Sequence, residues 1–69
     1  MNNGQFLISI GTKVRATRKA KGISMRQLAV LAPIHKSSLS EIENGKMNIH
    51  ILALKRLADT LGVDVKEFL

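Results

Sequence analysis

Apolar side chains recur along this chain in steps of three and four residues, the spacing that places them on one face of an α-helix. The first series is Phe6, Leu7, Ile10 and Val14, and a longer one runs from Ile51 to Leu61. No alternating strand pattern competes with these series. We therefore predict one all-α domain over residues 1–69, with five helices at about 6–21, 25–32, 36–44, 50–61 and 65–69.

Short motifs mark where these helices begin and end. Ser24 and Gln27 have the spacing of a capping box, and Ile23 and Leu28 flank them as a hydrophobic staple. The same pattern of cap, partner and staple recurs at the last helix, in Asp64, Glu67, Val63 and Phe68. Helix ends are expected at three glycines and just before a proline: Gly22, Gly45, Gly62 and Pro33.

The third predicted helix has two different faces. On a helical wheel Leu39 and Ile42 point to one side, and the other side carries short polar or charged residues: Ser37, Ser40, Glu41 and Asn44, with Lys36 at the edge. An ordinary solvated face has the same pattern. Serine, however, favours helix caps over helix interiors, and short side chains let a helix approach another surface closely. A DNA groove is one such surface.

The positive charge is confined to the first two-thirds of the chain. Residues 13–46 carry eight Lys and Arg residues against two acidic residues, whereas residues 47–69 carry three of each. The formal net charge of +6 therefore belongs to the first segment. A local basic field favours a polyanionic partner, nucleic acid before membrane, although many solvated surfaces are also basic.

Composition argues against several other functions. The chain has no cysteine, so it forms neither a disulfide nor a thiolate-zinc site, and its apolar runs are too short to cross a bilayer. His35 and His50 are too isolated to indicate a metal site, and no spacing indicates a nucleophile beside a base. We expect no metal, no cofactor, no enzymatic activity and no membrane contact, in a cytoplasmic protein.

The predicted helices at 25–32 and 36–44 are joined by three residues, which is the arrangement of a helix-turn-helix. In such a motif the first helix crosses the DNA backbone, and the second enters the major groove with its amino-terminal residues leading. The positive end of the second helix, together with Lys36, then lies near phosphates and base edges.

From residue 10 to residue 69 the sequence resembles the lambda-repressor-like (XRE or Cro-type) helix-turn-helix family. The matching strings are VRATRKAKGIS at 14–24, QLAVLA at 27–32, SSLSEIENGK at 37–46 and LADTLGVDVKEF at 57–68. The resemblance implies five helices, sequence-specific binding of a double-stranded DNA operator, and transcriptional regulation of repressor type in a bacterium or phage. It also implies association with the nucleoid when the protein is bound.

The resemblance further implies roles for individual residues. Base reading is implied for Lys36, Ser37, Ser40 and Glu41. A lysine can donate to guanine and a carboxylate can accept from cytosine, although Glu41 is equally consistent with a solvent-facing residue. Phosphate contacts are implied for Arg26, Gln27, Asn44, the backbone N–H groups of Gly45 and Lys46, and the Lys46 side chain. A plain helix cap also accounts for the residues at 44–46.

In similar domains the positions of Arg18 and Glu43 form a salt bridge between the first and third helices. Glu43 lies at the edge of the apolar face of its helix, which suits that role. A surface pair contributes about 0–1 kcal/mol, whereas loss of one partner of a desolvated pair costs about 3–5 kcal/mol. We therefore predict that Glu43 stabilises the fold and does not contact DNA.

Three positions depart from the family pattern. Met25 replaces a common glutamine that bridges phosphate and base, and Arg26 or Gln27 would have to compensate. Pro33 stands where glycine is usual, and His35 stands where a serine or threonine cap is usual. These differences leave the fold unaffected and bear on the implied base contacts.

Specific binding by such domains commonly uses two copies on half-sites about one DNA turn apart. The apolar residues that the helical faces leave unused are candidates for a homodimer surface: Leu52, Phe68 and Leu69. The staple position of Phe68 favours the core instead. One other function remains open, an antitoxin that binds a toxin protein partner. The helix-turn-helix argues against a third, a basic surface for membrane or RNA.

Overall fold

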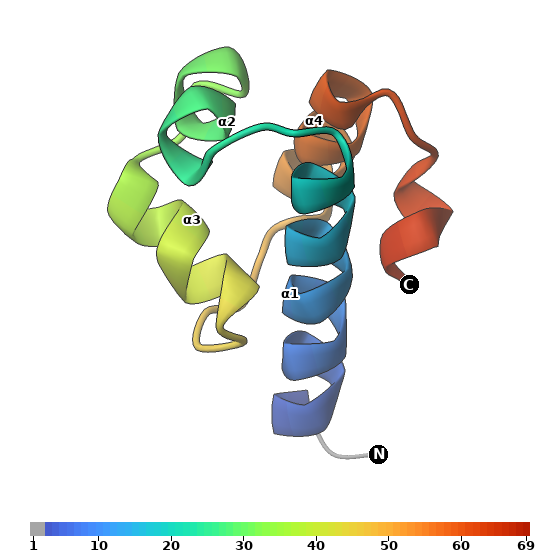
Figure 1. Cartoon of the computed structure of the whole chain (residues 1–69). Helices are drawn as coiled ribbons and strands as arrows, with labels where there is room; N and C mark the ends of the chain where they lie inside the picture. Colours follow the sequence, from blue (N-terminus) through green and yellow to red (C-terminus); the bar gives the residue numbers. More distant parts are fainter. Residues whose placement is uncertain (1–2) are drawn as a thin grey trace.

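The computed structural model describes residues 3–69 as four α-helices and one 3₁₀ helix. They are α1 (Asn3–Ala20), α2 (Met25–Leu31), α3 (Lys36–Glu43), α4 (Ile51–Leu61) and η1 (Val65–Phe68). In Figure 1, α1 forms the long axis of the molecule, with α2 and α3 on one side and η1 on the other. The described residues contain no strand, so the predicted all-α class is confirmed.

The predicted count of five α-helices is not confirmed, because the last element is a four-residue 3₁₀ helix that ends at Phe68. The Asp64 carboxylate accepts a hydrogen bond from the N–H of Lys66 at 3.0 Å, as a cap. The N–H of Glu67 donates to the carbonyl oxygen of Asp64 at 2.9 Å, the tighter pattern of a 3₁₀ turn. The first helix also begins at Asn3, earlier than the apolar series indicated.

One apolar core holds the elements together. Every α-helix and η1 contribute to it, and its least exposed large side chains are Val14, Leu28, Leu39, Leu54, Leu57 and Phe68. Burial of such a side chain stabilises a fold by about 1.5–3 kcal/mol. Phe68 is completely buried, in the core location that the sequence analysis favoured for it. It offers no surface to a second copy, and we remove it from the candidate dimer residues.

The capping box predicted at Ser24 is present, whereas the Glu67 side chain makes no bond back to Asp64 within residues 3–69. The Ser24 hydroxyl accepts from the N–H of Gln27 at 3.1 Å, and the Gln27 side-chain oxygen accepts from the N–H of Ser24 at 2.8 Å, which completes the capping box. Helix α2 ends two residues before Pro33. His50, which the sequence analysis left unassigned, caps α4, because its Nδ1 accepts from the N–H of Leu52 at 3.1 Å.

Helix α1 approaches α3 so closely that only glycine fits at two positions. A Cβ atom on Gly11 would collide with the backbone carbonyl groups of Ile42 and Glu43. A Cβ on Gly45 would lie 2.6 Å from the side chain of Ile8 and 2.7 Å from its Cα. Because backbone meets backbone here, the carboxyl end of α3 is fixed in position against α1.

Candidate nucleic-acid interface

Helices α2 and α3 form a compact two-helix motif. The chain between them is held by backbone bonds from the N–H of Ala32 to the carbonyl of Leu28 and from the N–H of Ile34 to the carbonyl of Ala29, both at 2.9 Å. Ala32 is buried in the turn, and Pro33 and His35 are exposed. The departures from the family pattern at Pro33 and His35 therefore do not disrupt the turn.

Helix α3 presents a polar face to the surroundings. Leu39, Ile42 and Glu43 are buried, and the residues on the opposite side are exposed or half-buried: Lys36, Ser37, Ser40, Glu41 and Asn44. The two faces match the predicted wheel. The four residues expected to read bases thus lie on one accessible surface, with no bulky apolar side chain among them.

The amino-terminal end of α3 is open. His35 occupies the N-cap but its side chain makes no capping hydrogen bond. The first N–H groups of a helix have no partner within the helix, and they carry the positive end of its dipole. With Lys36 exposed beside them, this end of α3 is suited to an anionic group.

The carboxyl end of α3 is closed by backbone hydrogen bonds, as expected for a helix cap at residues 44–46. The N–H of Gly45 donates to the carbonyl of Ile42 at 3.1 Å, and the N–H of Lys46 donates to the carbonyl of Glu41 at 2.9 Å. This is the Schellman motif, with Gly45 in the left-handed conformation at φ 70°. Both backbone donors that the sequence analysis assigned to phosphate are therefore engaged within the chain. The Asn44 amide also donates to the carbonyl of Ser40, at 2.9 Å.

Arg18 and Glu43 form a buried, two-pronged salt bridge between α1 and α3. The Arg18 Nε and Nη2 atoms donate to the two Glu43 carboxylate oxygens at 2.7 and 3.0 Å. The third guanidinium nitrogen, Nη1, donates to the carbonyl of Ile23 at 2.9 Å. The hydrogen bond to Glu43 raises the pKa of Arg18 above its usual value, against the lowering effect of burial. The pair therefore belongs to the scaffold that holds α3.

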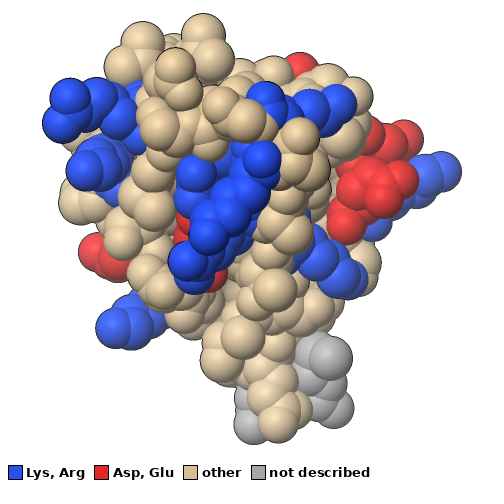
Figure 2. Space-filling view, in the orientation of Figure 1, with Lys and Arg blue, Asp and Glu red and all other residues tan. Residues whose placement is uncertain are grey.

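Exposed basic side chains without an acidic partner lie on α2 and at both ends of α3. Within residues 3–69 the ion pairs are Arg18–Glu43 and Lys55–Asp59, so Arg26, Lys36 and Lys46 are exposed without an acidic partner. Figure 2 shows Lys and Arg side chains spread over α1, α2 and α3, whereas the largest acidic group lies on the side of η1. The uneven distribution of charge along the sequence therefore corresponds to an uneven distribution over this face of the molecule.

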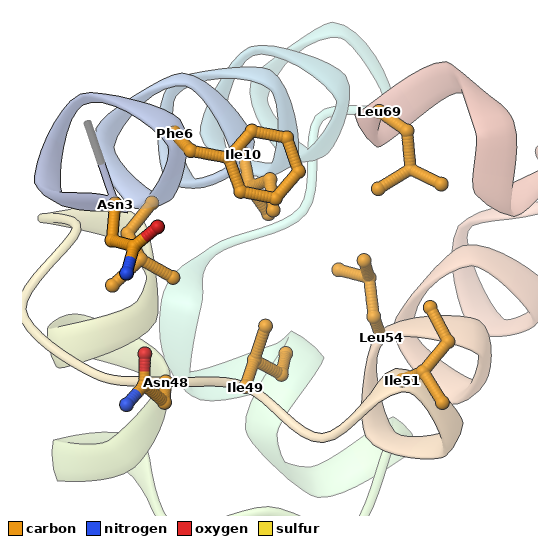
Figure 3. Close-up of a pocket in the computed structure, with 9 residues that line it drawn as sticks. Asn3, Phe6, Ile10, Asn48, Ile49, Ile51, Leu54 and Leu69 are labelled. Atoms are coloured by element: carbon orange, nitrogen blue, oxygen red, sulfur yellow. The ribbon is translucent and has the colours of Figure 1, made fainter. Parts of the chain in front are cut away.

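A second surface feature lies away from α3. An apolar groove of about 250 Å³ runs between the start of α1, the α3–α4 connection and the start of α4. Figure 3 shows Phe6, Ile51 and Leu69 at its edges, and each of them is about half exposed. Leu52, on the neighbouring outer face of α4, is 64% exposed.

Two absences concern the described part of the chain. Among residues 3–69 no helix has the length and apolar character needed to span a membrane. In the same residues no group of three His, Asp or Glu side chains is placed to hold a metal ion.

The two-helix motif, its packing on α1 and α4, and the polar face of α3 define a helix-turn-helix domain. The chain belongs to the helix-turn-helix family HTH_3, whose model matches residues 14–68. The resemblance to XRE-type and lambda-repressor-like regulators is thereby confirmed, and this fold is not enzymatic.

Alignments with known proteins of this family cover most of the chain. The HTH-type transcriptional regulator SlrR of Bacillus subtilis is 44% identical over 59 residues, which span 84% of this chain and 39% of SlrR. The control protein C.BamHI of Bacillus amyloliquefaciens is 33% identical over 69 residues, 99% of this chain and 83% of that protein. A crystal structure of SinR, a master regulator for biofilm formation, in complex with DNA matches with a TM-score of 0.80 and 38% identity. The match covers 86% of this chain and 95% of that one.

Proposed function

We propose that this chain binds double-stranded DNA in a sequence-specific manner and regulates transcription, as a repressor, with α3 in the major groove. The observation that carries the proposal is the exposed polar face of α3, fixed against α1, with the exposed and unpaired Lys36 and Lys46 at its two ends. The similarity to SinR, whose structure was solved in complex with DNA, supports it. The relatives reported above are regulators and control proteins, so the antitoxin alternative is not favoured.

In this proposal the amino-terminal half of α3 reads bases. Lys36 is the donor for guanine O6 or N7, Ser37 and Ser40 make short adaptable contacts, and Glu41 accepts from cytosine N4. Each well-formed pair of this kind discriminates against a wrong base by about 1–3 kcal/mol. The open helix end beside Lys36 supports this orientation, because its N–H groups face the anionic duplex first.

The phosphate contacts come from side chains on either side of the base-reading residues. They are Arg26 and the Gln27 amide nitrogen on α2, the Lys46 ammonium after α3, and Asn44. Gln27 uses its oxygen for the capping box, so its amide nitrogen is the atom that faces a phosphate. The role of Gly45 is structural, because its left-handed conformation sets the direction in which the chain continues at Lys46.

The experiment that tests the proposed function is selection of duplexes from a random pool, followed by binding measurements on the selected duplex and a scrambled one. We expect a preference for the selected duplex, and an affinity for both that falls steeply as salt concentration rises. Equal affinity for both duplexes would show that binding is not sequence-specific. Absence of binding to either duplex would contradict DNA binding. Binding that does not depend on salt would contradict the proposed phosphate contacts.

We further infer that the protein acts as a homodimer, with a second copy of the chain covering the apolar groove. Phe6, Ile51 and Leu69 at the groove and Leu52 beside it are large apolar side chains exposed on one region of the surface. A contiguous apolar surface of this kind is typical of an interaction site. Two α3 helices held by one dimer can occupy successive turns of the groove.

A further inference from the structure

Helix α1 carries two exposed basic residues, bonded to no other side chain or carbonyl of the described residues, that the proposed contacts do not include. Arg15 and Lys19 are one helical turn apart and both are exposed. Within residues 3–69 neither side chain takes part in an ion pair or a hydrogen bond to another residue. They differ in this from Arg18, which lies between them in sequence but is buried and bonded to Glu43.

The helical wheel of α1 places these two residues beside α3. Gly11 faces the backbone of α3, as its contact with Ile42 and Glu43 requires. At about 100° per residue, Arg15 lies roughly 40° and Lys19 roughly 80° around the helix from Gly11. Ile10 and Val14 lie in the opposite direction and are buried. Arg15 and Lys19 therefore form a basic ridge on the solvent side of the α1–α3 contact.

The wheel of α3 places its polar face on that same side. Glu43 faces α1, since it bonds Arg18. Ser40 and Asn44 lie roughly 60° and 100° from Glu43, in the direction opposite to buried Leu39 and Ile42. The basic ridge and this flank of α3 thus open toward the same side of the molecule. Figure 2 shows Lys and Arg side chains at the centre of the view, over α1 and next to α3.

We propose that the basic ridge, Arg15 and Lys19, binds the phosphate backbone that borders the groove entered by α3. The inference rests on the proposed function. Both oxygens of Glu43, the carboxylate of α3 that faces α1, are bonded to Arg18, and Glu43 forms no ion pair with the ridge. A guanidinium and an ammonium one helical turn apart have a spacing that lets them contact successive phosphates of one strand. Such contacts position a protein on DNA without reading its sequence.

The test compares two charge-matched double variants. R15Q/K19Q removes the ridge, and R56Q/K66Q removes two exposed, unpaired bases from α4 and η1, with the same change in net charge. The affinity of each variant and of the wild type is measured over a range of salt concentrations. The probes are a duplex selected by the wild type and a scrambled duplex of equal length. Melting curves show whether each variant is folded.

We expect R15Q/K19Q to weaken binding to both duplexes by the same factor. It should also reduce the slope of log affinity against log salt by about 1.8, at about 0.9 for each phosphate contact. R56Q/K66Q should change that slope by much less. Equal effects of the two variants would overturn the proposal, because net charge alone would then account for them. A loss confined to the selected duplex would also overturn it. If the wild type binds neither duplex, the proposed function fails as well.

Discussion

Arg18 and Glu43 lie close to the proposed base-reading residues, yet both are buried and bonded to each other. The guanidinium also holds the carbonyl of Ile23, so one side chain joins α1, α3 and the connection to α2. Removal of one partner would leave an uncompensated charge in the core. We expect these residues to affect DNA binding only through the fold.

We predict that Glu43→Ala lowers the free energy of unfolding by about 3–5 kcal/mol, because it leaves the Arg18 guanidinium buried without its carboxylate. The measurement is urea unfolding followed by circular dichroism. Glu41→Ala is the matched control, since it removes the same side chain from an exposed position of the same helix. Equal stability of the two variants would contradict the prediction.

The proposed base and phosphate contacts differ in how their loss depends on DNA sequence. We predict that Lys36→Ala and Ser37→Ala alter the preferred duplex, with about 1–3 kcal/mol lost at individual base pairs. Lys46→Ala should weaken binding to all duplexes about equally. Binding to a panel of single-base variants of the selected duplex distinguishes these results. An equal loss of affinity for every duplex in all three variants would contradict the base-reading roles of Lys36 and Ser37.

At the level of elements, the orientation of α3 is fixed mainly by α1. Gly11 allows the two backbones to meet, and Gly45 lets the chain turn beneath Ile8. The carboxyl end of α3 is also closed by the Schellman motif. A helix of only eight residues is marginal alone, so these contacts are what make its polar face a rigid surface.

We predict that Gly45→Ala destabilises the fold more than Gly22→Ala does. Both glycines have φ 70°, so both alanines bear a strain of about 1–2 kcal/mol from the left-handed conformation. Only at Gly45 would the new Cβ also collide with Ile8, whereas at Gly22 it would meet nothing within 4 Å. Overpacking of this kind adds about 1–3 kcal/mol. Identical melting temperatures for the two variants would show that the α1 contact is not tight.

The features predicted most reliably from the sequence are those that depend on residues close together in the chain. The capping box at Ser24 and the two faces of α3 require only spacings of three and four residues. The start of α1 was missed because its first turn is exposed and has no apolar periodicity. The cap at Gly45 was also expected from the sequence, whereas the engagement of the Lys46 N–H in it required the structure, because cap bonds and phosphate contacts use the same N–H groups. The groove was missed because it joins segments far apart in the chain.

At the level of the whole molecule, the two proposed interfaces occupy different regions. The polar face of α3 lies among basic side chains, and the groove lies between the start of α1 and the start of α4. The α3–α4 connection links them, because it follows Lys46 and lines the groove with Asn48 and Ile49. No residue that lines the groove belongs to α3.

We predict concentration-dependent self-association of the chain in sedimentation equilibrium, and a weakening of about tenfold or more by Leu69→Asp. Leu69 lines the groove and is 53% exposed, so the substitution should leave the monomer folded. Val30→Asp, at a 73% exposed apolar residue of α2 outside the groove, is the matched control. A chain that stays monomeric at high concentration, with and without duplex, would defeat the dimer.

The exposed face of α3 is the surface that we propose to meet DNA. Chemical-shift mapping by NMR, during titration of the chain with its selected duplex, reports this contact residue by residue. We predict the largest shifts at residues 36–41 and 44–46, with smaller ones at the start of α2 and little change on the outer face of α4. Strong shifts elsewhere, with the amide signals of α3 unmoved, would contradict the account.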